Sequence, residues 1–361
     1  LPLAAMAMEL PPEDLEAIVE LGLLEVAASG ATTVVESFRQ SQAMTFDVAA
    51  RLGLRFYGAP YLFSAASYAA GDTGTGGTLR DDARHLVAET LRFHRDYDGG
   101  ADGRLKFVLG PHAVDTCDAA LLAAVRDAAA ETGCLVTLHA AQSAGERQIM
   151  MDRHGEGALD HLTRAGLLGP GTILAHCIHL DDTEIGRMAD SGAAVASCPT
   201  VFARGGDFAP YWRFKRRGVR VGLGTDAYRM DFITEMRNAG LVSKLEEHAG
   251  GIASAHDLLA TATVDAAAIL GRSDLGILRA GAQADIVIVD LSRASLQPIF
   301  DPVKSLVWYA SAQDIDTVLV AGNFVMRDRM PATGDPARVA AKAGRAVRKV
   351  WDNARARGLI S

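Results

Sequence analysis

Short apolar runs rich in β-branched residues alternate along the first two thirds of the chain with longer stretches of helical periodicity. Each run is bounded by Gly, Pro or polar residues, a pattern typical of buried parallel strands. The predicted strands are Ala31–Val35, Arg55–Gly58, Leu105–Leu109, Leu135–His139, Thr172–Cys177, Ala193–Ser197 and Val219–Gly224.

Amphipathic segments fill the intervals between these runs. The predicted helices include Pro12–Ser29, Asp81–Tyr97, Asp118–Thr132, Gly157–Ala165 and Thr183–Ser191. Repeated strand–helix units imply a parallel sheet, because parallel neighbours need a crossover helix. Seven units are visible, one fewer than a closed eight-stranded barrel requires. We therefore expect an α/β fold, a (β/α)8 TIM-type barrel over residues 1–280 without its first strand.

The pattern changes after Gly281. Ala284–Asp290 predicts one strand, and Thr317–Met326 predicts two strands around an Ala-Gly-Asn turn. These are β-ribbons without crossover helices, so residues 281–332 are expected to form a small, β-sandwich-like subdomain. The Ala-, Lys- and Arg-rich segment Asp335–Arg357 predicts a helix within a C-terminal unit, residues 333–361.

Composition narrows the class of protein. Hydrophobic residues make up 49% and charged residues 22% of the 361 residues, as in a globular protein with a large core. Charges interrupt every run before it reaches the ~18 apolar residues of a membrane span. The net charge of −8 argues against nucleic acid as a partner. Four cysteines without a CxxC pair indicate reduced thiols and a cytoplasmic location.

Polar residues with ionisable side chains lie at the carboxyl ends of four of the predicted strands. They are His112, His139, His176 and Asp226. In a βα barrel the carboxyl ends of the strands meet at one mouth, where active sites form. Imidazole and carboxylate groups that converge there are the ligands a divalent transition metal requires. The sequence thus predicts a metal site at the mouth of the barrel.

Ordered motifs carry a family resemblance. They are Thr137-Leu-His-Ala-Ala-Gln-Ser143, Leu174–Ile185, Ser197-Cys-Pro-Thr200, Gly222-Leu-Gly-Thr-Asp226, Thr261–Ala267 and Gly276–Asp290. In this order and at these separations, the chain resembles the amidohydrolase superfamily, in its cytosine-deaminase-like and triazine-hydrolase-like branch. The resemblance implies a metal-dependent hydrolase of C–N bonds, of the deaminase type. Its substrate would be a small heterocycle or cyclic amide, attacked by a metal-activated water.

The resemblance also implies roles for individual residues. His139 corresponds to a metal ligand, His176 to the histidine that orients or deprotonates the water, and Asp226 to a metal ligand that shuttles a proton. His112 corresponds to a histidine that contacts substrate. One divalent metal is implied, with zinc expected first and iron as the alternative. Family members often assemble, so a homo-oligomer is expected.

Two departures from the family pattern qualify this prediction. The family's first strand ends in His-x-His, which supplies two metal ligands, and no His-x-His occurs in this sequence. We expect that strand to lie upstream of Leu1. Without it, His139 and Asp226 form an incomplete site, because zinc generally has three or four protein ligands. The alternative is an inactive or truncated amidohydrolase relative.

The second departure is Gln142, where most deaminases of this branch carry Glu. Glutamine forms hydrogen bonds but cannot deliver a proton. The glutamine therefore weakens the case for guanine- or cytosine-type deamination. It remains compatible with hydrolysis in which Asp226 protonates the leaving group, or in which the leaving group is a halide that needs no proton. Gln142 is therefore expected to bind substrate, and Arg204, on a Gly-rich loop, is expected to clamp an anionic or carbonyl group. A sugar-phosphate barrel enzyme is a third hypothesis, for which Gly205-Gly206 offers only a weak phosphate loop.

Overall fold

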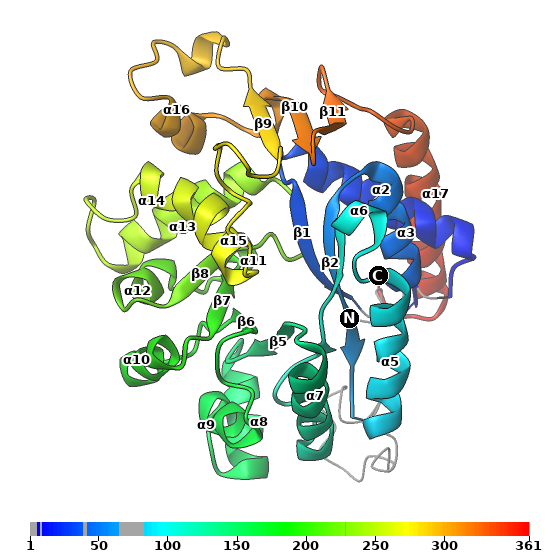
Figure 1. The fold of residues 1–361 in the computed structure, drawn as a ribbon, viewed down its shortest axis with the longest axis vertical. Helices are drawn as coiled ribbons and strands as arrows, with labels where there is room; N and C mark the ends of the chain where they lie inside the picture. Colours follow the sequence, from blue (N-terminus) through cyan, green and yellow to red (C-terminus); the bar gives the residue numbers. More distant parts are fainter. Residues whose placement is uncertain (1–5, 8, 39–41, 65–82, 228, 361) are drawn as a thin grey trace.

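The structure is a computed structural model that describes residues 6–7, 9–38, 42–64, 83–227 and 229–360. Parallel strands wrapped by helices make up most of it, and a small antiparallel sheet lies at one end (Figure 1). The predicted α/β architecture is confirmed.

Within the described residues, seven strand positions follow one another in chain order. The strands are β1 (Thr33–Phe38), β2 (Arg55–Leu62), β3 (Leu105–Phe107) continued by β4 (Gly110–Pro111), β5 (Val136–Ala140), β6 (Thr172–His176), β7 (Ala194–Ser197) and β8 (Arg220–Leu223). All their pairings are parallel. Single bridges, Leu109 with Val136 and Ala113 with His139, join β1–β4 to β5–β8. No ladder joins β1 to β8 in the described chain, so this TIM-type barrel is open there.

Helices cover the outer side of the strands. They are α2 (Pro12–Ala28), α3 (Gln42–Leu52), α5 (Ala83–Tyr97), α6 (Gly100–Gly103), α7 (Ala119–Thr132), α8 (Ala144–His154), α9 (Ala158–Ala165), α10 (Asp182–Ser191), α11 (Pro199–Gly205), α12 (Tyr211–Arg216), α13 (Phe232–Glu246), α14 (Ala255–Ala260) and α15 (Ala266–Ile269). Side chains of Asp118, Ser143 and Asp181 cap α7, α8 and α10 by accepting backbone N–H groups. Asp81 and Asp82, in the predicted helix before Tyr97, lie outside the described residues.

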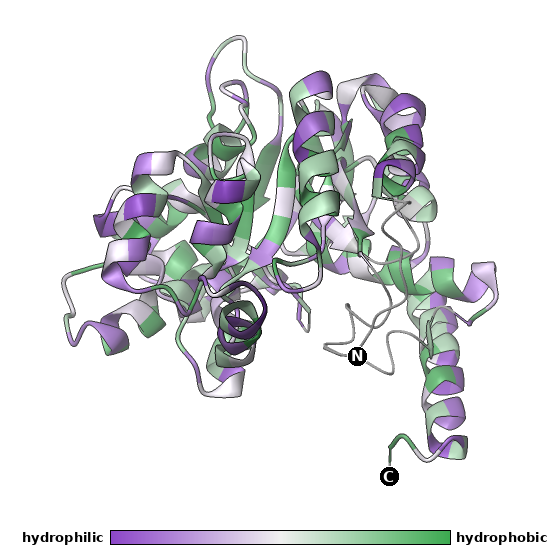
Figure 2. Ribbon diagram, turned by 90° about the horizontal axis from the view of Figure 1, so that it is seen from below, coloured by the Kyte–Doolittle hydropathy of each residue, from purple (hydrophilic) through white to green (hydrophobic). Residues whose placement is uncertain are grey.

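Apolar residues pack on both faces of the parallel strands. On the outer face, the Phe46 ring of α3 lies over Gly58, where a Cβ would come within 2.3 Å of it. On the inner face, Tyr57, Ala59 and Val108 form a smaller buried group. Figure 2 shows this layering, with green apolar strands between helices whose outer turns are purple. Successive side chains of a strand point to opposite faces of the sheet. The same alternation sets the face to which each residue at the end of a strand points.

The small sheet is antiparallel and consists of one layer in the described chain, not two facing layers. Its strands are β9 (Ile286–Val289), β10 (Ile315–Val320), β11 (Asn323–Arg327) and β12 (Met330–Pro331), in the order β12-β11-β10-β9. The predicted turn between β10 and β11 is confirmed. Ala321 and Gly322 have φ values of 50° and 80°, which a tight hairpin of this hand requires. Helix α16 (Pro302–Tyr309) lies between β9 and β10 in the chain.

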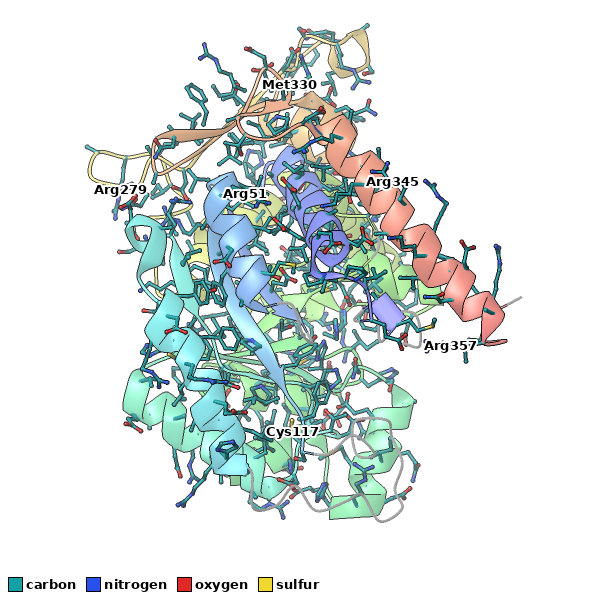
Figure 3. All side chains as sticks on the ribbon, turned by 90° about the vertical axis from the view of Figure 1, so that its right-hand side faces the viewer. Arg51, Cys117, Arg279, Met330, Arg345 and Arg357 are labelled. Carbon is teal, nitrogen blue, oxygen red and sulfur yellow. The ribbon has the colours of Figure 1, made fainter. Side chains whose placement is uncertain are left out.

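The contacts that join this sheet and the last helix to the barrel include a buried ion pair and a pair of packed helices. Arg55 at the start of β2 donates to both carboxylate oxygens of Asp285, at 3.0 and 2.9 Å, and both side chains are buried. Helix α17 (Pro336–Ala356) packs along α2, with Arg345 midway and Arg357 beyond its end (Figure 3). Arg357 pairs with Glu9.

Among the described helices, none combines the length and the apolar composition needed to cross a membrane.

Candidate metal centre

Histidine rings from neighbouring strand ends form a row at the mouth of the barrel. The ring centroids of His112 and His139 are 5.0 Å apart, and those of His139 and His176 are 5.2 Å apart. The parallel register of β5 and β6 explains this spacing, because it pairs His139 with Ala175 and Ala140 with His176. The predicted convergence of the three histidines is therefore present.

His139 is held in one tautomer. Its Nδ1 lies 2.5 Å from the backbone carbonyl of His112, and a carbonyl only accepts, so Nδ1 carries the proton. In the neutral ring this leaves the Nε2 lone pair free to accept a hydrogen bond or to bind a metal. The His112 ring is itself fixed by the Thr116 hydroxyl, 2.8 Å from its Nδ1.

His176 ends β6 in a left-handed conformation, with a φ of 77°. The side chain is 5% exposed, and burial together with the nearby His139 lowers the pKa of His176 to about 3. The ring is therefore neutral at physiological pH, the form in which histidine binds a metal. Its buried Nδ1 has no hydrogen-bond partner among the residues that the structure describes.

Asp226 follows β8 and faces His176. Its Oδ2 lies 3.7 Å from His176 Nε2, and its Oδ1 accepts the backbone N–H of Ala227 at 2.5 Å. The Asp226 side chain is 34% exposed, so solvent reaches it from the mouth. The fourth predicted residue thus lies beside the histidine row.

Cys198 is a neighbour that the sequence analysis did not single out. Ligand atoms of His176, Cys198 and Asp226 lie within 4.8 Å of one another. The thiol is buried between β7 and α11, and burial raises the pKa of Cys198 well above its ordinary value. The sequence offered one sign of this position, because Cys198 stands at the end of a predicted strand, as His176 does.

The donor set fits a divalent transition metal. Neutral imidazole nitrogens and a carboxylate oxygen are ligands that Zn²⁺ and Fe²⁺ accept. His176 also fits, because its neutral ring faces the Asp226 carboxylate through Nε2, 3.7 Å from Oδ2. His139 meets a further requirement, since its Nδ1 donates to a carbonyl, as metal-binding histidines do.

Other predicted residues lie around this row. Gln142 is half-buried in the turn after β5, where its backbone N–H donates to Glu146 at 3.0 Å. Arg204 is exposed and lies in α11 rather than on the predicted loop, because Pro199 starts a helix that continues to Gly205. His179, three residues beyond His176, has its Nε2 3.4 Å from Oδ2 of Asp207.

A buried acid behind Asp226 also escaped the sequence analysis. Glu235 of α13 is 1% exposed and accepts the backbone N–H of Thr200 at 3.2 Å. Burial raises the pKa of Glu235 to about 7, and the charges of Asp231 and Asp226 add to the effect. The spacing of Glu235 in the chain gives no sign of this contact, which depends on how α13 packs against α11.

Comparisons with known proteins identify the family of the chain. The model of the amidohydrolase family matches residues 1–325. A 5-methylthioadenosine/S-adenosylhomocysteine deaminase of Pelotomaculum thermopropionicum is 32% identical over 92% of this chain and 75% of its own length. The chain therefore spans about three quarters of that relative.

Solved structures extend the comparison. A zinc-bound adenosine deaminase from Xanthomonas campestris is 25% identical, with a TM-score of 0.86 over 95% of this chain and 76% of its own. An atrazine chlorohydrolase from Arthrobacter aurescens has a TM-score of 0.84 at 24% identity, over 94% and 78% of the two chains, and shares the fold. The chain belongs to the amidohydrolase family, as its ordered motifs predicted, and is a hydrolase of carbon–nitrogen bonds other than peptide bonds.

Proposed function

We propose that this protein is a zinc-dependent deaminase of adenosine-type nucleosides, with 5-methylthioadenosine and S-adenosylhomocysteine as the first candidate substrates. The observation that carries the proposal is the row formed by His112, His139, His176 and Asp226 at the strand ends. The similarity to a relative with that activity supports the choice of substrate.

His139 and Asp226 are the proposed metal ligands, with His176 beside them. The fixed tautomer of His139 and the accessible carboxylate of Asp226 suit this role. Zinc is the proposed metal because imidazole and carboxylate ligands favour it, and because a structural relative binds it. When bound, a divalent metal lowers the pKa of a coordinated water toward ~7.

The chain's own residues provide the proton transfers. Hydrolytic deamination adds water to the ring carbon that bears the amino group, and ammonia then leaves. The attacking water must lose a proton, and Asp226 is the exposed carboxylate placed to accept it and return it to the leaving nitrogen. His176 stays neutral, because burial lowers its pKa to about 3, so it orients the water as a hydrogen-bond acceptor.

Substrate binding is assigned to residues around the row. Gln142 is proposed to hydrogen-bond a ring nitrogen, since its amide can donate but cannot release a proton. The centroid of the His112 ring lies 4.8 Å from that of the Tyr61 ring. His112 is proposed to contact the nucleoside. Arg204 is proposed to bind a polar group at the rim.

The cytoplasmic location, the homo-oligomer and the inactive-relative alternative stay predictions. The alternative is open because the proposed ligands His139 and Asp226 supply two of the three or four that zinc generally takes.

An ammonia-release assay with a substrate panel tests the proposal. The panel contains adenosine, 5′-deoxyadenosine, 5-methylthioadenosine, S-adenosylhomocysteine, guanine, cytosine and a chlorinated triazine. We expect release from the adenosine-type compounds and its loss in Asp226→Asn. Asp207→Asn is the matched control, because it removes an exposed carboxylate that pairs with His179 at the same rim. Release from none of the aminopurines, with zinc bound, would contradict the proposal.

A further inference from the structure

The turn between β5 and α8 has an unusual backbone. Ala141 adopts a φ of 49°, in the left-handed region that residues with a Cβ seldom occupy. The turn separates His139 from α8 and carries Gln142. On its carbonyl side it is tied to the turn after β6, because Ala140 O accepts the N–H of Cys177 and Ala141 O accepts that of His179. The conformation of this turn therefore affects two strands of the site.

One side chain satisfies the N–H groups of the turn. Glu146 is 2% exposed, and its Oε1 accepts the N–H of Ala141 at 2.6 Å while its Oε2 accepts that of Gln142 at 3.0 Å. Ser143 caps α8 by accepting the N–H of Glu146 at 3.0 Å. The Glu146 carboxyl group reaches back from the first turn of α8 to the two residues that precede Ser143. Two oxygens thus serve two adjacent donors.

The surroundings of Glu146 make this contact costly to replace. The side chain of Gln142 also hydrogen-bonds to the carboxyl group. Burial and the charge of Asp115 raise the pKa of Glu146 to about 7, and burial together with the charge of Glu146 raises the pKa of the Cys177 thiol. Burying a carboxyl group costs free energy unless hydrogen bonds compensate for the lost water. Here the N–H groups of Ala141 and Gln142 provide those hydrogen bonds, one to each carboxyl oxygen.

We propose that Glu146 is a positioning residue, whose carboxyl group holds the left-handed turn at Ala141 and, through its hydrogen bonds to Gln142, fixes the position of that side chain in the site. This inference rests on the proposed deaminase function for its kinetic consequence. Glu146 acts through Gln142 and does not touch the reacting atoms.

A double-mutant cycle measures that dependence. Glutamine at position 146 accepts only one of the two N–H groups and sets its own N–H against the other. We expect Glu146→Gln to lower kcat/KM by about tenfold, the size of a buried donor left unpaired. Gln142→Ala should have a similar effect, and the double variant should be within about twofold of Gln142→Ala alone. Independent effects, which multiply to about a hundredfold, would overturn the inference.

A matched control and a rescue separate this role from general stability. Glu184→Gln changes another glutamate that accepts a backbone N–H, from Asp181 at 2.9 Å, in the first turn of α10. It should leave kcat/KM unchanged. Adding Ala141→Gly to Glu146→Gln should restore folding and part of the activity, because glycine adopts positive φ without a Cβ penalty. If adding Ala141→Gly to Glu146→Gln raised neither stability nor kcat/KM, the proposal would be contradicted.

Amide hydrogen exchange gives a readout independent of activity. Glu146→Gln should speed exchange at the N–H groups of Ala141 and Gln142 by at least about tenfold, and Glu184→Gln should not. Unchanged exchange at both amides would overturn the inference. A wild-type chain that releases no ammonia from any aminopurine contradicts the proposed function instead, and the exchange result still decides whether Glu146 holds the turn.

Discussion

The Nε2 atom of His176 lies 3.7 Å from Oδ2 of Asp226, and the two side chains differ sharply in exposure, at 5% and 34%. Burial lowers the pKa of His176 to about 3, so this ring does not carry a proton near neutral pH. Asp226 is open to solvent, and it is the member of the pair to which we assign the proposed proton transfer. The division of roles rests on environment rather than on residue type alone.

Replacing Asp226 by Asn should therefore be the most damaging single change in the site. Asparagine keeps the size and one oxygen but cannot accept a proton from water. We expect kcat to fall by about 10²–10⁴-fold, the range for lost general acid–base catalysis. Steady-state ammonia release measures this, and an unchanged melting temperature confirms the fold. Full turnover in Asp226→Asn would exclude the proposed proton path.

His139→Ala should act through a different quantity, the metal occupancy. The hydrogen bond from His139 Nδ1 to the His112 carbonyl directs the Nε2 lone pair, so we expect the ring to bind metal rather than to move protons. Its loss should cost more than the ~10–100-fold in metal affinity typical of losing a group that only orients a ligand, and excess zinc should partly restore turnover. Titration with zinc, followed by activity, checks the expectation. Failure of saturating zinc to raise activity would argue against a ligand role.

The strands and the histidine row could be predicted because the signals are local. Each apolar run that ends in a polar residue identifies a strand end, and parallel strands bring such ends together. His112, His139, His176 and Asp226 were found in this way. The helix that starts after Ser143 was missed because its apolar residues have weak helical periodicity, although Ser143 and Glu146 gave a usable start signal.

Contacts made by tertiary packing could not be predicted. Alanine has no preference for positive φ, so nothing at Ala141 indicates the left-handed turn that Glu146 stabilises. Cys198 approaches His176 only because β6 and β7 are neighbours with this register. The Arg55–Asp285 pair spans most of the chain, and neither residue has a local partner that would mark it.

The buried glutamates give the protein a specific pH dependence of stability. Burial raises the pKa of Glu146 and of Glu235 to about 7 from an ordinary value of 4.5. Between these values each glutamate keeps a proton in the folded state that the unfolded state has released, so the glutamates' contribution to the free energy of unfolding should fall as pH rises from 4.5 to 7, while His176, whose pKa is lowered, contributes in the opposite direction. Urea unfolding of wild type and Glu235→Gln across this range should show a shallower slope in the variant. Equal slopes would assign the dependence to other groups.

Arg55 and Asp285 should matter for stability rather than for catalysis. Both are buried, and Asp285 also accepts the N–H of Ala321, so loss of the arginine leaves an uncompensated carboxylate. Arg55→Met should lower the free energy of unfolding by about 3–5 kcal/mol. Arg51→Met is the matched control, since Arg51 is 47% exposed and pairs with Glu16, and it should cost at most about 1 kcal/mol. Equal losses in urea unfolding would refute the distinction.

Metal content measured together with ammonia release from 5-methylthioadenosine tests the central claim most directly. The account predicts that chelation abolishes release, and that added zinc restores it as occupancy approaches about one metal per chain. The Asp226→Asn protein should stay inactive at any zinc concentration. Ammonia release that survives chelation, or a wild-type chain that binds no stoichiometric divalent metal, would contradict the account.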